Sequence, residues 1–209
     1  MRTQKTALLG LFAEHGGYLT SRQVRVAGLS LKPVQRLIDQ GEVEAVQRGV
    51  YRLTAADLPP HADLIELQLR VPYARPALIT ALDLHGLTTT RPTVIQVAIP
   101  LNAAFPALAF PPVEVFWYPP GVYDHGVIRW TSSEPGFETY SAEKTIADLL
   151  RLERRLGRDV YLEGLKNYLA RPDRDPDRDL PALLTAAQGN GVDRQLRRDL
   201  EVLTHEANR

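Results

Sequence analysis

Apolar side chains recur at helical spacing three times along the first 40 residues. The first amphipathic stretch, residues 3–15, is followed by a pair of glycines, which favours an end to the helix. Thr20 or Ser21 is a suitable N-cap for a second, short helix, because its hydroxyl can accept from a free backbone N–H of the first turn. A third stretch, residues 31–40, has Ser30 as its expected cap. The pattern therefore predicts three consecutive helices.

Short apolar runs at strand spacing replace the helical spacing after the third helix. Residues 43–45 and 50–53 read as two short strands, joined by a tight turn at Arg48-Gly49. The Pro59-Pro60 pair follows, and we expect a domain boundary there because neither proline continues a helix. Three helices and a hairpin predict a winged helix-turn-helix domain over residues 1–58.

The rest of the chain, residues 59–209, mixes helical and strand spacing. Helical spacing covers residues 64–71 and 77–85, and it returns after Ser141, a suitable N-cap, and continues toward the C-terminus. Between these helices lie three expected strands, residues 94–99, 113–116 and 127–130. We expect a mixed α/β second domain, so the fold class is α+β.

Composition narrows the class of protein. With 209 residues, 44% of them hydrophobic, the chain is long enough for one or two cores. It has no cysteine, which excludes disulfide frameworks and cysteine-ligated metal sites and fits a reducing cytoplasm, where we expect the protein. Residues 7–13 lack a signal-peptide cleavage site, and the uncharged stretch between Arg91 and Glu114 contains five prolines. We expect no membrane partner.

Charge is distributed unevenly, although the whole chain carries 25 basic and 25 acidic residues. Residues 1–58 contain eight bases and five acids, a net charge of +3. Residues 59–140 contain four bases and seven acids, a net charge of −3, and residues 141–209 balance at thirteen each. A polyanionic partner should therefore meet the N-terminal segment.

The third predicted helix has an apolar and a polar face. Lys32, Gln35 and Arg36 share the polar face, and such side chains pair with guanine or adenine edges when a helix lies in the major groove. Nearby basic residues are then expected to hold phosphates, namely Arg22, Arg25, Arg48 and Arg52. The alternative is an ordinary solvated helix face. The basic excess and the turns on either side of the helix favour double-stranded DNA as the partner.

Three features of the sequence resemble catalytic or metal-binding sites. His85 follows Asp83 by two residues, and a histidine beside an acid is one arrangement of a general base or a metal site. We expect His85 instead to end a helix and to pack or hydrogen-bond locally. The aspartates of residues 172–179 alternate with arginines and lack the glycine and glutamate of an EF-hand, which predicts a solvated linker. Glu143-Lys144 has no identifiable acidic partner for a nuclease metal. We expect no catalytic residue, metal or cofactor.

An aromatic cluster is a candidate surface for contact with bases or with a protein partner. Strand periodicity places about half of it in the core, so the alternative is ordinary packing. Its members are Phe116, Trp117, Tyr118, Tyr123 and Trp130.

Several short motifs resemble the AbiEi antitoxin family. In the predicted winged helix they are residues 17–23 (GYLTSRQ), 27–30 (AGLS), 36–38 (RLI) and 47–53 (QRGVYRL). In the second domain they are residues 80–87 (TALDLHGL) and 141–150 (SAEKTIADLL), with Thr80 where the family has serine. The resemblance runs from about residue 5 to about residue 170.

This resemblance implies one half of a type IV toxin–antitoxin pair. The winged helix would repress its own operon at inverted repeats, and the second domain would counter a nucleotidyltransferase toxin. Two other functions stay open from the residues alone: a metal-dependent nuclease delivered to DNA by the winged helix, and a protein-interaction module.

Overall fold

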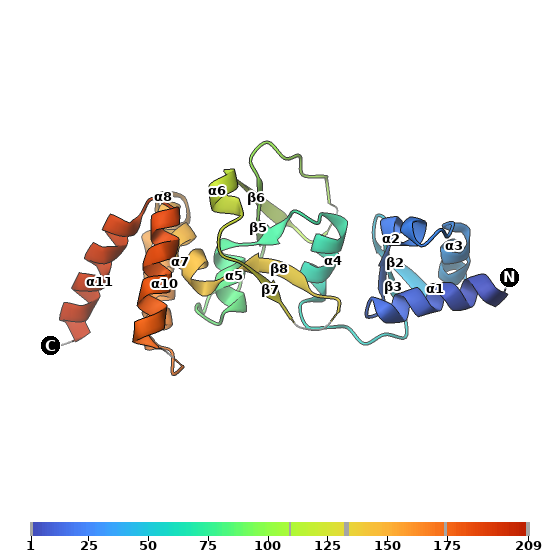
Figure 1. Ribbon diagram of the computed structural model, residues 1–209, viewed down its shortest axis with the longest axis horizontal. Coiled ribbons are helices and arrows are strands. Elements are labelled where there is room, and N and C mark those ends of the chain that lie inside the picture. The colour runs from blue at the N-terminus through green and yellow to red at the C-terminus, as the bar shows by residue number, and fades with distance from the viewer. Residues whose placement is uncertain (1, 109, 132–133, 174, 208–209) are drawn as a thin grey trace. The chain divides into compact units, whose positions relative to one another are not determined.

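A computed structural model describes residues 2–108, 110–131, 134–173 and 175–207, and helices and strands mix along them (Figure 1). The chain divides into two units by internal contacts. Unit 1 consists of Met1–Ala74 and Arg129–Glu138, and unit 2 of Arg75–Ile128 and Thr139–Arg209. The mixed α and β class is confirmed.

The N-terminal part of unit 1 is a winged helix, as the hydrophobic pattern predicts. Its elements are α1 (Arg2–Glu14), β1 (Tyr18–Thr20), α2 (Ser21–Val26), α3 (Lys32–Asp39), β2 (Val43–Gln47) and β3 (Val50–Leu53). The three strands form an antiparallel sheet in the order β1-β3-β2. One apolar side of each helix meets the sheet, giving a core of Leu8, Phe12, Leu19, Val24, Val34, Leu37 and Val43. Strand β1 was not predicted, because three residues are too few to show alternation.

The two predicted caps of this region have different outcomes. Thr20 caps α2, since its hydroxyl accepts from the backbone N–H of Gln23 while the Gln23 side chain accepts from the backbone N–H of Thr20. The prediction that Ser30 caps α3 is wrong: Leu31 is the N-cap and makes no side-chain bond. Pro33 lies in the first turn and has no N–H, so α3 has one free donor fewer to satisfy.

Unit 1 continues beyond residue 58 with α4 (Ala62–Arg70). The Glu66 carboxylate of α4 accepts from Tyr18 Oη at 3.0 Å and pairs with Arg52 at 3.3 Å, which ties α4 to the winged-helix sheet. Gln68 Nε2 donates to the carbonyl of Glu138 at 2.9 Å, which ties α4 to the segment 129–138. That residues 1–58 fold alone stays a prediction.

Unit 2 surrounds a small sheet with helices. Its first elements are β4 (Arg75–Pro76), α5 (Leu78–Leu84), β5 (Ile95–Pro100), β6 (Val113–Tyr118) and α6 (Pro120–Tyr123). Strand β5 pairs antiparallel with β4 and parallel with β6. The strands β7 (Val127–Trp130) and β8 (Phe137–Tyr140) form a separate ladder whose residues are shared between the two units. Strand β7 coincides with its predicted range, whereas β8 was not predicted.

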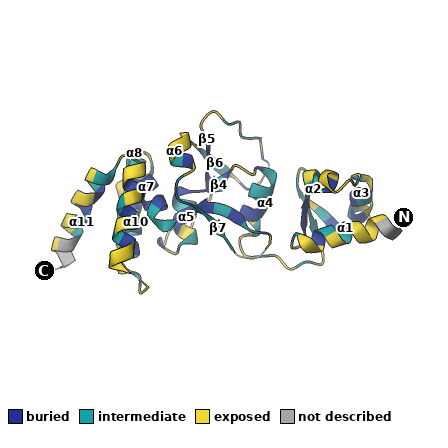
Figure 2. Ribbon diagram, viewed as in Figure 1, coloured by how far each residue is buried: buried dark blue, intermediate teal, exposed yellow. Residues whose placement is uncertain are grey.

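The last five helices complete unit 2. They are α7 (Ala142–Arg151), α8 (Glu153–Leu156), α9 (Arg158–Ala170), α10 (Pro176–Gly189) and α11 (Asp193–Ala207). Ser141 caps α7 as predicted, accepting from the backbone N–H of Lys144. Helix α7 packs against α5, α9 and α10, so residues 144–150 are all buried, whereas α10 keeps an exposed side (Figure 2).

The solvated linker predicted over residues 172–179 is wrong for its second half. Asp175 caps α10, which begins at Pro176. The Asp179 side chain is buried and accepts from Arg171 at 2.6 Å and from Arg178 at 3.1 Å. The alternating charges thus form a local network that holds the start of the helix, where the sequence pattern suggested only solvation.

Candidate nucleic-acid interface

The polar face of α3 is free of the core. Val34 and Leu37 are buried, whereas Lys32, Gln35 and Arg36 are all exposed. Among the ion pairs of the described residues, none includes Lys32 or Arg36. These cations are thus available to an incoming ligand.

Gln35 makes a side-chain hydrogen bond within α3. Its Nε2 donates to Asp39 Oδ1 at 3.0 Å. The bond joins two exposed side chains one helical turn apart, and such pairs contribute only about 0.2–0.5 kcal/mol. The amide is therefore easily released to pair with a base.

Helix α2, which precedes α3 in the winged helix, presents two arginines to solvent. The Thr20 capping box fixes the first turn of α2, and Val24 is buried in the winged-helix core. Arg22 and Arg25 consequently point outward and are exposed. Neither takes part in an ion pair among the described residues.

The tip of the wing is fastened to the start of α2. Gly49 has a φ of +78°, a conformation that favours glycine, and its carbonyl accepts from the backbone N–H of Ser21 at 2.8 Å. The Ser21 hydroxyl also lies 3.1 Å from the Tyr51 hydroxyl. Arg48, which precedes this glycine, is exposed. The wing and α2 therefore hold their arginines in a fixed relation.

Arg52, the fourth expected phosphate ligand, has a different place. Its side chain is 15% exposed and pairs with Glu44 and Glu66. Burial raises the pKa of the Glu66 carboxyl, although its bonds with Tyr18 and Arg52 act in the opposite direction. Arg52 thus pairs with one exposed and one largely buried carboxylate inside unit 1.

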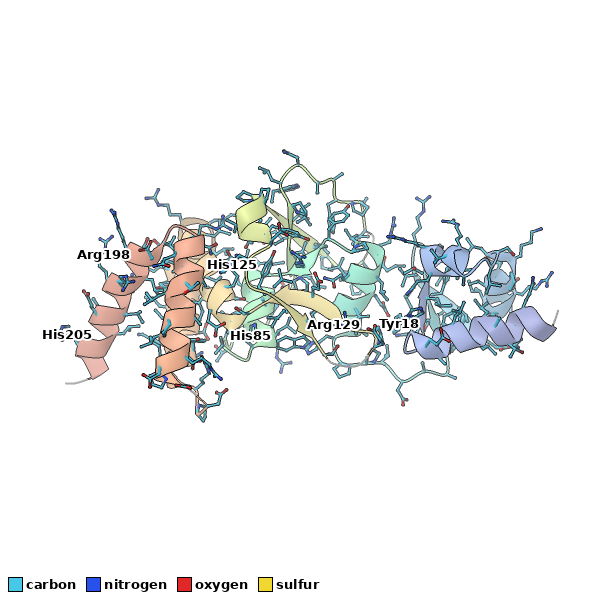
Figure 3. The ribbon with its side chains drawn as sticks, in the orientation of Figure 1. Tyr18, His85, His125, Arg129, Arg198 and His205 are labelled. Carbon is cyan, nitrogen blue, oxygen red and sulfur yellow. The ribbon has the colours of Figure 1, made fainter. Side chains whose placement is uncertain are left out.

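One pocket of unit 1 joins residues that the sequence keeps apart. It measures about 710 Å³ and is lined by the arginines of α2 and the wing, together with Arg70 from α4 and Arg129 from β7. Arg129 is labelled in Figure 3. Sequence reasoning missed Arg70 and Arg129, because both lie in the segment 59–140 with its net negative charge. No local signal identifies them, since only the packing of α4 and of residues 129–138 brings them to the wing.

The residues that resembled catalytic groups in the sequence, His85 and Lys144, take part in packing and local pairing. His85 ends α5, and its Nε2 lies 2.8 Å from the Tyr140 carbonyl, as expected of a packed histidine (Figure 3). Lys144 is fully buried and pairs with Asp148 at 2.5 Å. Across the described residues, no group of three or more His, Cys, Asp or Glu side chains is placed to hold a metal ion.

A second pocket, of about 640 Å³, lies in unit 2 beside His85. Its charged lining is already paired: Glu143 accepts from the Tyr168 hydroxyl at 2.7 Å, and Arg171 pairs with Asp179. The Arg171 guanidinium also lies 3.7 Å from the centre of the Tyr168 ring. This arrangement stabilises the junction of α7, α9 and α10 and leaves few polar groups for a ligand.

The aromatic cluster does not form one surface. Phe116, Tyr118 and Tyr123 are buried in the core of unit 2. Trp117 is 51% exposed, and its Nε1 donates to the Ala103 carbonyl at 3.0 Å. Trp130 belongs to unit 1, where it stacks on Phe137. Most of the cluster is therefore structural.

Comparison with known proteins identifies the N-terminal part of the chain. Residues 7–54 match the family described as "Transcriptional regulator, AbiEi antitoxin". The match covers the winged helix from α1 to the end of β3 and agrees with the resemblance seen in the motifs. No curated protein matches the chain. In the described part of the chain, no helix is both long and apolar enough to cross a membrane.

Proposed function

We propose that this chain, whose residues 7–54 match the AbiEi antitoxin family of transcriptional regulators, is a sequence-specific DNA-binding repressor of its own operon. The observation that carries the proposal is the polar face of α3. It presents an amide and two cations, which form no ion pair with any residue that the structure describes, on the helix that follows the turn of a winged helix-turn-helix. In that fold, this helix enters the major groove.

In the proposed complex, Lys32, Gln35 and Arg36 read base edges. Lysine and arginine suit guanine O6 and N7, and the glutamine amide suits adenine N6 and N7. Arg22, Arg25 and Arg48 hold phosphates on either side and set the register of α3. Arg52 is left out of this contact set, because its ion pairs lie within unit 1.

The wider role proposed for the protein follows its family. The winged helix would occupy inverted repeats in the promoter and exclude polymerase, in the cytoplasm and without cofactor or catalysis. Unit 2 would serve to counter a nucleotidyltransferase toxin. The support for this part is the family match of unit 1 and the resemblance of residues 80–87 and 141–150 to family motifs.

Fluorescence anisotropy of the full chain on its own upstream duplex and on a random duplex of equal length tests DNA recognition. We expect a preference of about a thousandfold for the upstream duplex, abolished by Lys32→Ala/Gln35→Ala/Arg36→Ala. A matched triple change at exposed positions of unit 2, Arg154→Ala/Lys166→Ala/Arg194→Ala, should leave the preference intact.

Three results would overturn the proposal. Equal affinity for both duplexes would remove sequence recognition, and absent binding would favour a protein-interaction module. Cleavage of the labelled duplex with magnesium or manganese would instead indicate a nuclease. Co-expression with the adjacent gene then tests the antitoxin role, which requires that growth be rescued only when unit 2 is present.

A further inference from the structure

We infer that the 710 Å³ pocket of unit 1 extends the proposed phosphate contacts and carries the backbone of the bound DNA from the winged helix onto α4 and β7. The inference rests on the proposed DNA binding and extends it to two residues outside the matched family region, Arg70 and Arg129. The ligand class is the phosphodiester backbone flanking the bases that α3 reads.

The charge of the lining points to an anion. Five arginines line the pocket, against one carboxylate, that of Glu138. Among the described residues, no ion pair involves the arginines of α2 or of the wing, nor Arg70. Like charges held this close repel one another, so a site that gathers them is stabilised when a polyanion enters.

Arg129 has a partner, but a weak one. It pairs with Glu134 at 2.5 Å, and the two side chains are 49% and 57% exposed. An exposed pair of this kind is screened by solvent and contributes about 0–1 kcal/mol. A phosphate with two acceptor oxygens can therefore replace Glu134 as the ligand of the guanidinium.

The part of the chain that carries Arg129 is fixed against the winged helix. Gly16 has a φ of +60°, and a Cβ placed there would lie 2.3 Å from the Glu134 carbonyl oxygen and 2.5 Å from Pro135 Cδ. The chain therefore passes directly over a position where only glycine fits. This close contact holds residues 134–135 at the end of α1.

Helix α4 is fixed to the same segment by a side-chain bridge. Gln68 Nε2 donates to the Glu138 carbonyl at 2.9 Å, and Gln68 Oε1 accepts from the Glu138 backbone N–H at 2.6 Å. Two bonds from one amide act like a rung of a β-ladder. Arg70 lies two residues after Gln68 in the same helix, so it shares this frame with Arg129, and a preorganised site loses little entropy when it binds.

The position of the pocket favours a DNA backbone, and not a free anion, as its ligand. Two of its sides are α2 and the wing, which contact the phosphates on both sides of the recognition helix in winged-helix complexes. A phosphate strand that leaves Arg22 or Arg48 therefore continues into the space between them and Arg70. An isolated effector site would not need to open onto the DNA-contacting elements.

The test measures the salt dependence of binding for the full chain on its upstream duplex and on a random duplex. We expect Arg70→Gln and Arg129→Gln each to reduce the slope of log K against log salt concentration by about 0.9, and the double variant to reduce it by about 1.8. The affinity for both duplexes should fall by the same factor, because phosphates carry no sequence information. Arg70→Lys/Arg129→Lys should keep the slope, and Arg91→Gln is the matched exposed control in unit 2.

The outcomes separate this inference from the proposed function. A wild-type preference for the upstream duplex, with an unchanged slope in the double glutamine variant, would overturn the inference and leave the repressor proposal standing. Absence of any preference, with the slope still lowered by the double variant, would overturn the repressor and support the site. Competition by inorganic phosphate beyond that of potassium chloride at equal ionic strength, lost in the double variant, would indicate a free-anion pocket and overturn the backbone assignment.

Discussion

The arginines of α2 and the wing in unit 1 differ from several cations of unit 2 in whether a carboxylate pairs with them. In unit 1 the arginines of α2 and of the wing are exposed and pair with no described carboxylate. In unit 2 three cations are instead paired: the buried Lys144 with Asp148, the largely buried Arg171 with Asp179, and the partly exposed Arg158 with Asp199. The number of basic residues in a segment therefore does not by itself indicate an anionic ligand, because some of these residues are already paired with carboxylates.

Lys144 is the extreme case in unit 2. It has no exposed surface, and its Nζ lies 5.1 Å and 4.9 Å from the ring centres of Tyr118 and Tyr140. Burial lowers the pKa of Lys144, whereas the Asp148 carboxylate acts to raise it. Asn190 Nδ2 adds a hydrogen bond to Asp148 at 2.8 Å. The pair holds α7 in place because each charge needs the other once water is excluded.

The largest expected effect comes from breaking this buried pair. Replacing Lys144 with Met leaves the Asp148 carboxylate buried without its main partner, so the free energy of unfolding should fall by about 3–5 kcal/mol. The double variant Lys144→Met/Asp148→Asn removes both charges and keeps an acceptor for Asn190, and it should recover part of that loss. Urea denaturation measures both changes.

The matched control for the buried pair lies on the open surface of unit 1. Arg25→Gln should change the free energy of unfolding by no more than about 0.5 kcal/mol, since Arg25 is exposed and unpaired among the described residues. A double variant less stable than Lys144→Met alone would show that the uncompensated charge is not the cause of the loss.

The next largest effect concerns the proposed base contacts of α3. Arg36→Ala should cost about 1–3 kcal/mol of binding free energy on the upstream duplex and far less on random DNA, because a base contact is lost only where the base is present. Arg48→Ala should weaken binding to both duplexes equally and lower the salt slope by about one. Equal losses on both duplexes for Arg36→Ala would contradict its role in reading bases.

Within unit 1, Arg52 is paired with carboxylates whereas Arg48 is not paired with any described residue. Arg52→Gln should lower the free energy of unfolding by about 1.5–3 kcal/mol, because it removes charge-assisted bonds to Glu44 and Glu66. The salt slope of DNA binding should stay at the wild-type value. Arg48→Gln should show the reverse, a lower slope with unchanged stability. A slope reduced by about one in Arg52→Gln would return Arg52 to the phosphate contacts.

The periodicity of the sequence was sufficient for the winged helix and for the faces of its helices. A spacing of 3.6 residues separates Val34 and Leu37 from Lys32 and Arg36 without any knowledge of the tertiary structure, and the structure places all four accordingly. Helix starts were less secure, as the absent cap at Ser30 shows, because Pro33 alters what the first turn requires.

The partners of the charged residues could not be predicted in the same way. No sequence feature near Arg52 predicts its pairing with Glu66, and none near Arg70 predicts that Arg129 lines the same pocket. These residues are distant in sequence and come together only through the packing of α4 and of residues 129–138. The pair of Lys144 and Asp148 was not predicted, and although a spacing of four residues puts both on one face of a helix, it does not indicate that they are buried. Burial follows from α7 being covered by α5, α9 and α10.

The smallest expected effect is a pH dependence that arises in unit 2 from His85. Burial lowers the pKa of His85, which the Tyr140 carbonyl and Glu143 act to raise and Arg171 to lower further. The folded state therefore binds fewer protons than the unfolded state below the ordinary histidine pKa of about 6.5. The stabilisation that comes from neutral, buried His85 is fully present above that pH, and it is lost as the pH falls toward the lowered pKa of His85 in the folded state.

His85→Gln removes this titration while leaving an amide that can donate to the Tyr140 carbonyl. We expect the free energy of unfolding of the wild type to decline more than that of the variant when the pH is lowered from 7.5 to 5.5. Carboxylates with lowered pKa values, such as Glu143, stay ionised over this range and cancel in the difference. If the free energy of unfolding of the variant falls as much as that of the wild type, burial does not lower the pKa of His85. In that case the His85 ring in unit 2 would be as accessible to protons as the exposed side chains of unit 1.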